Sequence, residues 1–269
     1  MGKKEKALFF IIVFFAIILR IYNLDKVPPE LFGDEVDVGY QAYSVLKTGR
    51  DVYNQFLPSY FHSFSEWRAP LYLYATVPFI AVFGLNEWGV RLTAVFFGII
   101  SVVLVYLVAK QLFKSPAVSL TAAAFLAFSP WHLQYSRAGF ELTLLLSLVL
   151  AGVYGFLRTK ENKRWWFLTT VCFSLTFYTY STAVLFVPLF CFFLWFIFRE
   201  SARPGLKHLL PAMIILLPFL VNLISGQARS RFETLSVTNL DQVTVNDLNF
   251  ARNNAVNFWW KPKDGISLK

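Results

Sequence analysis

The chain has 269 residues, of which 57% are hydrophobic, 19% aromatic and only 15% charged, and its formal net charge is +9. This composition is typical of a polytopic membrane protein, so we exclude the nucleic-acid partner that a basic soluble protein would suggest. Its two cysteines, Cys172 and Cys191, lie inside apolar runs and form neither a disulfide framework nor a metal-ligand spacing.

The N-terminus combines a short basic segment, Lys3-Lys4-Glu5-Lys6, with an apolar run from Ala7 to Leu19. A secretory signal peptide would have this form, but no small-x-small cleavage site follows the run. We therefore predict an uncleaved transmembrane helix, with Arg20 extending towards the membrane surface near its far end.

Further apolar segments follow along the chain, several of them shorter than the ~20 residues that a straight membrane span needs. Together with the first, they predict an all-α polytopic membrane protein with about seven transmembrane helices. The predicted segments are 7–24, 89–109, 116–129, 142–157, 165–180, 183–198 and 208–225. Aromatic residues at their ends would extend the short segments to the membrane surface.

The segment 69–84 is apolar enough either to span the membrane or to lie along its surface. If it does not span, the loops on the N-terminal side carry twelve Lys and Arg against three Asp and Glu, whereas loop 25–88 carries four against eight. This asymmetry is the positive-inside pattern. It predicts a multi-pass protein of the cell membrane with a cytoplasmic N-terminus. Loop 25–88 and its juxtamembrane helices would then face outward.

We expect two parts in the chain. Residues 1–225 would form the transmembrane module, and residues 226–269, which are mixed and polar, would form an outer-face tail. Because the tail ends without a structural stop signal, we expect it to be the start of a missing C-terminal part. The chain would then be an N-terminal fragment.

The first outer loop is rich in acids, and its stretch from Asp34 to Lys47 has helical periodicity. Gly49 would end the helix. Asp34 and Glu35 would lie at its N-terminus, where the helix dipole favours negative charge. On spacing alone, the two acids either cap a surface helix or carry a function. The apolar positions of the helix are Val36, Tyr40, Tyr43 and Leu46.

The stretch GDEVDVGYQAYSVLKTGRD resembles the first-loop motif of the GT-C class of membrane glycosyltransferases. This class includes the protein O-mannosyltransferases and the aminoarabinose transferase of lipid A. Three further elements are similar to that family and follow in order. They are Arg68-Ala69-Pro70-Leu71-Tyr72, then Gly84 with Trp88 and Arg91-Leu92, then Ser129-Pro130 with Ser136-Arg137 and Glu141. The resemblance covers roughly residues 7 to 225.

The resemblance implies an inverting glycosyltransferase that moves a sugar from a polyprenyl-phosphate donor to an acceptor on the outer face of the membrane. Lipid, polysaccharide and protein acceptors all stay open. The reaction needs a base near the acceptor and positive charge near the departing phosphate. Asp34 matches the family's catalytic position. Because helix neighbours point ~100° apart, we predict Asp34 as the base and Glu35 as its structural or acceptor-binding partner.

Arginine binds phosphate oxygens in bidentate fashion, so Arg68 and Arg137 are predicted to bind the donor phosphate. Other candidates for substrate binding lie on the outer face, each with a plain structural alternative: Glu141, His132, Tyr178, Tyr180, Arg229 and Arg231. We predict no metal site. Glu66 lies two residues before Arg68, whereas in some relatives a metal-binding Glu directly precedes the basic residue of this motif. Whether the protein needs a divalent cation stays open.

Two other functions stay open from the sequence. A transporter would place ionisable residues or Gly and Pro breaks in the middle of its spans. The predicted helices between 89 and 225 have no ionisable residue at mid-span, which argues against that function. An inactive membrane scaffold, or a fragment of an enzyme, would keep the helices without the chemistry.

Overall fold

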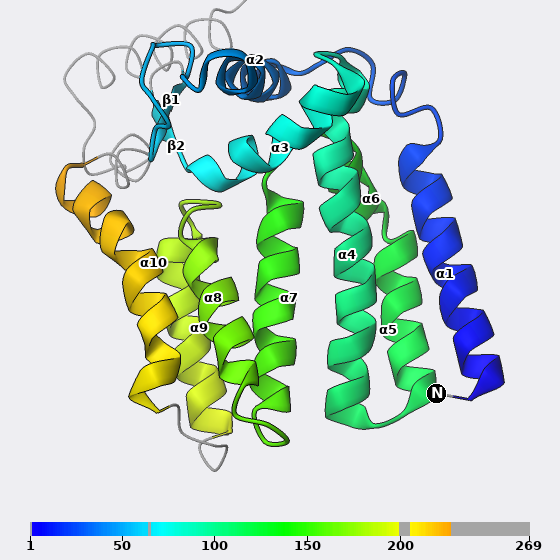
Figure 1. Ribbon diagram of the computed structural model, residues 1–269. Helices are drawn as coiled ribbons and strands as arrows, with labels where there is room; N and C mark the ends of the chain where they lie inside the picture. The colour runs from blue at the N-terminus through cyan, green and yellow to red at the C-terminus, as the bar shows by residue number, and fades with distance from the viewer. Residues whose placement is uncertain (1, 64–65, 199–204, 227–269) are drawn as a thin grey trace, which may run out of the picture. The chain divides into compact units, whose positions relative to one another are not determined.

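The computed structural model of the chain describes residues 2–63, 66–198 and 205–226, which are mainly helical (Figure 1). The helices are α1 (Lys3–Ile21), α2 (Gly33–Thr48), α3 (Pro70–Phe83), α4 (Glu87–Phe113), α5 (Pro116–Phe128), α6 (Pro130–Arg137), α7 (Leu142–Arg158), α8 (Trp165–Thr176), α9 (Ala183–Ile197) and α10 (Leu206–Ile224). The described elements belong to one compact unit, Met1–Arg229. Almost all of the predicted tail lies outside the described residues.

Helices form in every segment predicted to span, but the count of seven spans is not confirmed. Among the described residues, α4 and α10 are long and apolar enough to cross a membrane, and α6 with α7 would add a third span, bent by 116°. The apolar helices α5, α8 and α9 have only 13, 12 and 15 residues. They are therefore shorter than the ~20 residues of a straight span.

The long helix α4 packs against both α5 and α7, and α7 in turn packs against α8 (Figure 1). Two glycines of α7 permit the close approach of α8. A Cβ atom added at Gly152 would lie 2.7 Å from the ring of Phe173, and one added at Gly155 would lie 2.8 Å from Oγ1 of Thr169. Small residues are typical of helix contacts in membranes, because lipid is as apolar as the side chains and packing has to supply the attraction.

Helices α2 and α3 lie across one end of the longer helices, and the N-terminus lies at the other end (Figure 1). α3 contacts α2 on one side and α4 on the other. The expectation that 69–84 does not span fits this arrangement and stays a prediction.

Helix α2 begins and ends close to the predicted limits, and Gly49 follows it with a φ of 68°. This left-handed conformation favours glycine. The apolar stripe that includes Tyr40 and Tyr43 faces outward, whereas Glu35, Val38 and Gln41 are buried. The helix therefore packs through a side that carries polar groups, because those groups find partners there.

A short antiparallel hairpin, β1 (Phe61–Ser63) and β2 (Glu66–Arg68), adds to the predicted all-α fold. Its register places Phe61 opposite Arg68. Gln41 of α2 holds it, since Nε2 of Gln41 donates to the carbonyl of His62 at 2.9 Å. The hairpin thus brings the end of β2 beside α2.

Candidate active site

The first turn of α2 and the end of β2 bring Asp34 and Arg68 together. Nη2 of Arg68 donates to Oδ1 of Asp34, and Nη1 lies 3.9 Å from Oδ2 of Asp37. The side chain of Arg68 is 9% exposed, whereas that of Asp34 is 37% exposed. The structure thus pairs the predicted base with a predicted phosphate-binding arginine, at a place that solvent reaches through Asp34. We call this the open pair.

The neighbouring carboxylate, Glu35, is enclosed. Its side chain is 1% exposed and forms a two-point ion pair with Arg91 of α4, with Nε to Oε1 at 2.9 Å and Nη2 to Oε2 at 3.2 Å. Two backbone amides add hydrogen bonds, from Phe32 to Oε2 at 3.1 Å and from Gly139 to Oε1 at 2.8 Å. A carboxylate can be buried when its charge and its lone pairs are satisfied in this way. We call Arg91–Glu35 the closed pair.

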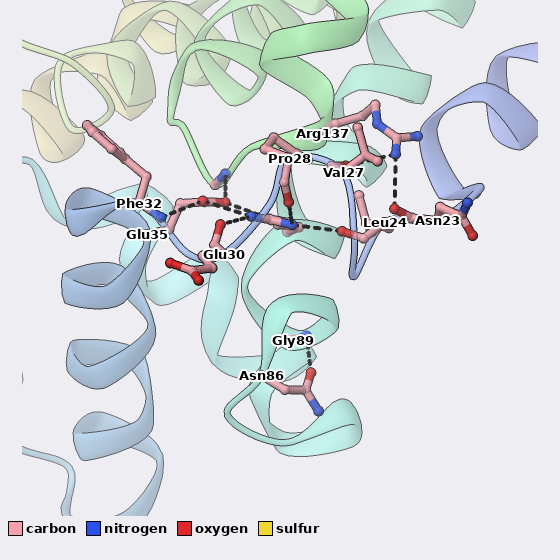
Figure 2. A network of polar contacts seen from close by, with 12 residues as sticks. Asn23, Leu24, Val27, Pro28, Glu30, Phe32, Glu35, Asn86, Gly89 and Arg137 are labelled. Atoms are coloured by element: carbon pink, nitrogen blue, oxygen red, sulfur yellow. Dashed lines mark hydrogen bonds and ion pairs between the residues drawn. The ribbon is translucent and has the colours of Figure 1, made fainter.

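Arg91 uses all five of its N–H donors. Besides the two hydrogen bonds to Glu35, Nη1 donates to the carbonyls of Leu24 at 2.8 Å and Pro28 at 2.9 Å, and Nη2 donates to that of Glu30 at 2.6 Å. Figure 2 shows these loop carbonyls turned towards one guanidinium. The closed pair therefore joins α4, the loop that follows α1, and the start of α2.

In the sequence, Arg91 lies in one of the family-like motifs, and no role is predicted for it. A signal was present, because an arginine close to the start of an apolar helix is rare in membrane segments and usually has a specific partner. Its partner Glu35 lies 56 residues earlier in the chain, so no spacing rule could identify it.

Tyr72, in the first turn of α3, is buried near the closed pair. Burial raises the pKa of the Tyr72 phenol well above its ordinary value, and the negative charges of Glu141 and Glu35 raise it further. Among the described residues the Tyr72 hydroxyl has no hydrogen-bond partner. Glu141 occupies the N-cap position of α7, where its side chain makes no capping hydrogen bond. The predicted acid of the second loop thus approaches this region from α7.

Arg137, the second predicted phosphate-binding residue, binds backbone carbonyls in the last turn of α1 and in the loop that follows it. Nη1 donates to Leu19 at 2.6 Å, and Nη2 donates to Tyr22, Asn23 and Val27 at 2.8, 3.2 and 2.8 Å. Figure 2 shows its guanidinium beside Asn23 and Val27. The hydrogen bonds described for Arg137 include neither Asp34 nor Arg68, and its phosphate role stays a prediction.

His132 is buried, and its Nδ1 lies 2.7 Å from Nη2 of Arg20. Nη1 of Arg20 donates to the carbonyls of Ala16 and Ala127, at the ends of α1 and α5. The expectation that Arg20 extends towards the membrane surface is therefore wrong, since its side chain is fully buried. The Arg20 guanidinium finds its hydrogen-bond acceptors inside the protein, at two helix carbonyls and an imidazole, and does not need those of the membrane surface.

Tyr178 links three helices at the end of the molecule that carries the site. Its hydroxyl donates to the carbonyl of Ile215 in α10 at 2.5 Å, and its own carbonyl accepts from the amide of Leu71 in α3 at 2.8 Å. Tyr180 is half-buried in the same turn after α8. These contacts give Tyr178 a structural task, and the substrate roles of both tyrosines stay predictions.

Two predicted residues, Arg229 and Arg231, lie outside the described residues. Within the part of the chain that the structure describes, no group of three or more His, Cys, Asp and Glu side chains is placed to hold a metal ion.

The family model described as dolichyl-phosphate-mannose-protein mannosyltransferase matches residues 67–224, more than half of the chain. The match includes Arg68, Arg91 and the second loop, and it begins after α2, which carries Asp34 and Glu35. No curated protein and no solved structure matches the chain. The family expected from the resemblance is confirmed, and the chain belongs to the dolichyl-phosphate-mannose-protein mannosyltransferases, a family of membrane glycosyltransferases.

Proposed function

We propose that the protein transfers a sugar from a polyprenyl-phosphate donor to an acceptor, with inversion at the sugar carbon and with Asp34 as the general base. The difference in exposure within one helical turn supports this most. The side chain of Asp34 is 37% exposed beside a buried arginine, whereas Glu35 is 1% exposed and fully paired. A base has to reach the proton of the acceptor, and of the two neighbours Asp34 is the accessible one.

The family match supports the class of donor. The matched family is named for dolichyl-phosphate mannose as its donor and for protein as its acceptor. We carry the donor class to this chain, with mannose as the first sugar to test. The acceptor is a hydroxyl or amine of a lipid, a polysaccharide or a protein.

In the proposed reaction, an oxygen or nitrogen of the acceptor forms a bond to the anomeric carbon of the sugar. The bond between that carbon and the phosphate oxygen breaks, and its electron pair stays on the phosphate. The acceptor proton passes to the carboxylate of Asp34. The guanidinium of Arg68 stabilises the negative charge that develops on the departing phosphate.

The contact between Asp34 and Arg68 suits both tasks. Arg68 reaches Asp34 through Nη2, and a guanidinium carries five N–H donors in all. An arriving donor phosphate would take hydrogen bonds from Arg68 and leave the carboxylate oxygen of Asp34 for the acceptor. Because both Nη groups of Arg137 already serve carbonyls, we assign the phosphate to Arg68. We assign Glu35 the positioning of the turn that carries Asp34.

Incubation of the purified protein with a panel of polyprenyl-phosphate sugars tests this proposal. Wild-type protein is expected to release polyprenyl phosphate from at least one donor. Asp34→Asn keeps the size of the side chain but removes the base, so turnover should fall by roughly 10²–10⁴-fold with donor binding retained. Asp25→Asn, a matched change of another acid in the same loop, should leave turnover unchanged. Release from no donor, or a near-normal rate for Asp34→Asn, would overturn the proposal.

We also propose that the site faces the outer side of the cell membrane, on the strength of the basic loops at the other end of the helices. Lys47, Gln134 and Asn162 are exposed, and single cysteines at these positions report sidedness. In intact cells, cysteines at 47 and 134 should react with a membrane-impermeant thiol reagent, and one at 162 should not. Labelling confined to position 162 would reverse the orientation.

A further inference from the structure

A second carboxylate of α2, that of Asp37, faces the arginine of the open pair. Asp37 follows Asp34 by three residues, and residues three apart in a helix are neighbours on its surface. Nη2 of Arg68 donates to Asp34, whereas Nη1 of the same guanidinium lies 3.9 Å from Oδ2 of Asp37. One guanidinium therefore faces two carboxylates and presents a different nitrogen to each of them.

The side chain of Asp37 is enclosed, and its ion pair with Arg68 is incomplete. It is 12% exposed, compared with 37% for Asp34. Its Oδ2 is buried, and within the described part of the chain this oxygen accepts no hydrogen bond. The distance of 3.9 Å to Arg68 is short enough for an ion pair but roughly 1 Å longer than a charge-assisted hydrogen bond. A buried acceptor without a donor is costly, so a small movement of Arg68 towards Asp37 would be favourable.

The proposed reaction changes the charges around Arg68. Its side chain is only 9% exposed, and a buried cation is strongly destabilised when it loses an anionic partner. Asp34 is such a partner in the resting protein, but it becomes neutral when it takes the proton of the acceptor. The phosphate then leaves with the lipid, so Arg68 needs another anion until Asp34 has passed its proton to water. Asp37 is placed to be that anion.

We propose that Asp37 is a positioning residue, which holds Arg68 through Nη1 while Nη2 turns from Asp34 to the donor phosphate. This role rests on the proposed function, because it concerns the same base and the same phosphate. It has two effects of opposite sign. The negative charge of Asp37 repels the phosphate and weakens its binding slightly. The same charge raises turnover, since it frees the carboxylate of Asp34 and keeps Arg68 in place for the departing phosphate.

Asp37→Asn in the full chain tests this role, because it removes the charge and keeps the size of the side chain. With the sugar donor that wild-type protein cleaves, kcat should fall by about 10–100-fold, as it does when catalytic groups are misplaced by about 1 Å. The Kd for polyprenyl phosphate should fall by about 2–5-fold, the value of a partly exposed charge interaction. Binding thus becomes tighter while turnover becomes slower, whereas a residue that only supported the fold would lose both. The binding measurement also shows that the variant is folded.

Two further variants control this experiment. Asp37→Glu keeps the charge on a longer side chain that can close the gap to Nη1 of Arg68, so it should restore most of the turnover. Asp25→Asn removes one negative charge from another acid of the same loop and should change neither kcat nor Kd. If Asp25→Asn also gave tighter binding and slower turnover, the effect would come from the net charge of the loop, and the role of Asp37 would be wrong.

A double change tests whether Asp37 acts through Arg68. In an Arg68→Ala protein, the further change Asp37→Asn should lower kcat little or not at all, because the guanidinium that Asp37 holds is already absent. Residues that act as a unit are non-additive in this way. An equal fall of kcat in the two backgrounds would show that Asp37 acts independently of Arg68 and would overturn the role.

The outcomes separate this role from the proposed function. If Asp34→Asn loses turnover while Asp37→Asn keeps the wild-type kcat and Kd, the role of Asp37 is wrong and the proposed function stands. Weaker binding of polyprenyl phosphate by Asp37→Asn would also overturn the role alone. If Asp37→Asn loses turnover and Asp34→Asn keeps it, the assignment of the base and the role of Asp37 are both wrong. Release of polyprenyl phosphate from no donor would likewise overturn both.

Discussion

The closed pair and the open pair begin from neighbouring residues of α2 and end in different environments. In the closed pair, Arg91 and Glu35 are 0% and 1% exposed, and each N–H group of the guanidinium has an acceptor. In the open pair, Asp34 remains 37% exposed beside Arg68. The same two kinds of side chain thus form a structural joint in one place and an accessible polar site in the other.

The surroundings of each pair explain this difference. Glu35 points towards α4 and meets the amide of Gly139, whereas Asp34 points towards the end of the hairpin. A buried ion pair is tolerated when its remaining donors and acceptors are satisfied. Removing one partner then leaves an uncompensated buried charge, which strongly destabilises the folded protein. An ion pair with an accessible member can exchange that member for a ligand. Under the proposed function, the closed pair holds the turn that carries Asp34, and the open pair binds the substrate.

The largest effect on stability is expected from Arg91→Leu. It would leave the carboxylate of Glu35 buried without its cation and remove the donors that three loop carbonyls share, so the free energy of unfolding should fall by about 3–5 kcal/mol. Thermal unfolding in detergent measures this. Arg68→Leu should cost less, because solvent reaches Asp34. The double change Arg91→Leu with Glu35→Leu should recover part of the loss. Equal destabilisation by the two single arginine changes would remove the distinction between the pairs.

A smaller effect, on binding instead of stability, is expected at Arg68. Arg68→Ala should weaken the binding of polyprenyl phosphate by about 1.5–3 kcal/mol, the value of a hydrogen bond to a charged group. Arg68→Lys should weaken it less, because the charge is kept and the two-pronged geometry is lost. A dissociation constant for each variant measures the effect. If both variants bind like wild type, Arg68 does not hold the phosphate.

The smallest effect is expected from Asn86→Ala. Oδ1 of Asn86 accepts from the amide of Gly89 at 3.0 Å and caps α4 one turn before Arg91 (Figure 2). Loss of this cap should lower the free energy of unfolding by about 1 kcal/mol, and Asn86→Asp should restore it. Donor affinity should not change, because the cap supports the closed pair only. A variant with normal stability and weakened donor binding would show that the two pairs are coupled.

How much could be predicted is clearest in α2. Its limits followed from periodicity and from Gly49, which are local properties of the chain. The side through which α2 packs could not be predicted from the sequence. Gln41 and Glu35 are buried because they bind partners that lie far away in the sequence. Val36 and Tyr40, which the pattern places on an apolar stripe, are exposed. The hairpin was also missed, since three-residue strands carry too little periodicity to be recognised.

The sequence by itself determined the helical membrane class and the family, and it singled out Asp34 and Arg68 as candidates for the chemistry. These depend on composition, periodicity and ordered motifs, which need no knowledge of contacts. The tertiary structure decided that Glu35 is enclosed while Asp34 is accessible, that Arg91 is the partner of Glu35, and that Arg20 is buried with His132. Each of these depends on long-range contacts, because burial and hydrogen bonding are set by what the fold brings together.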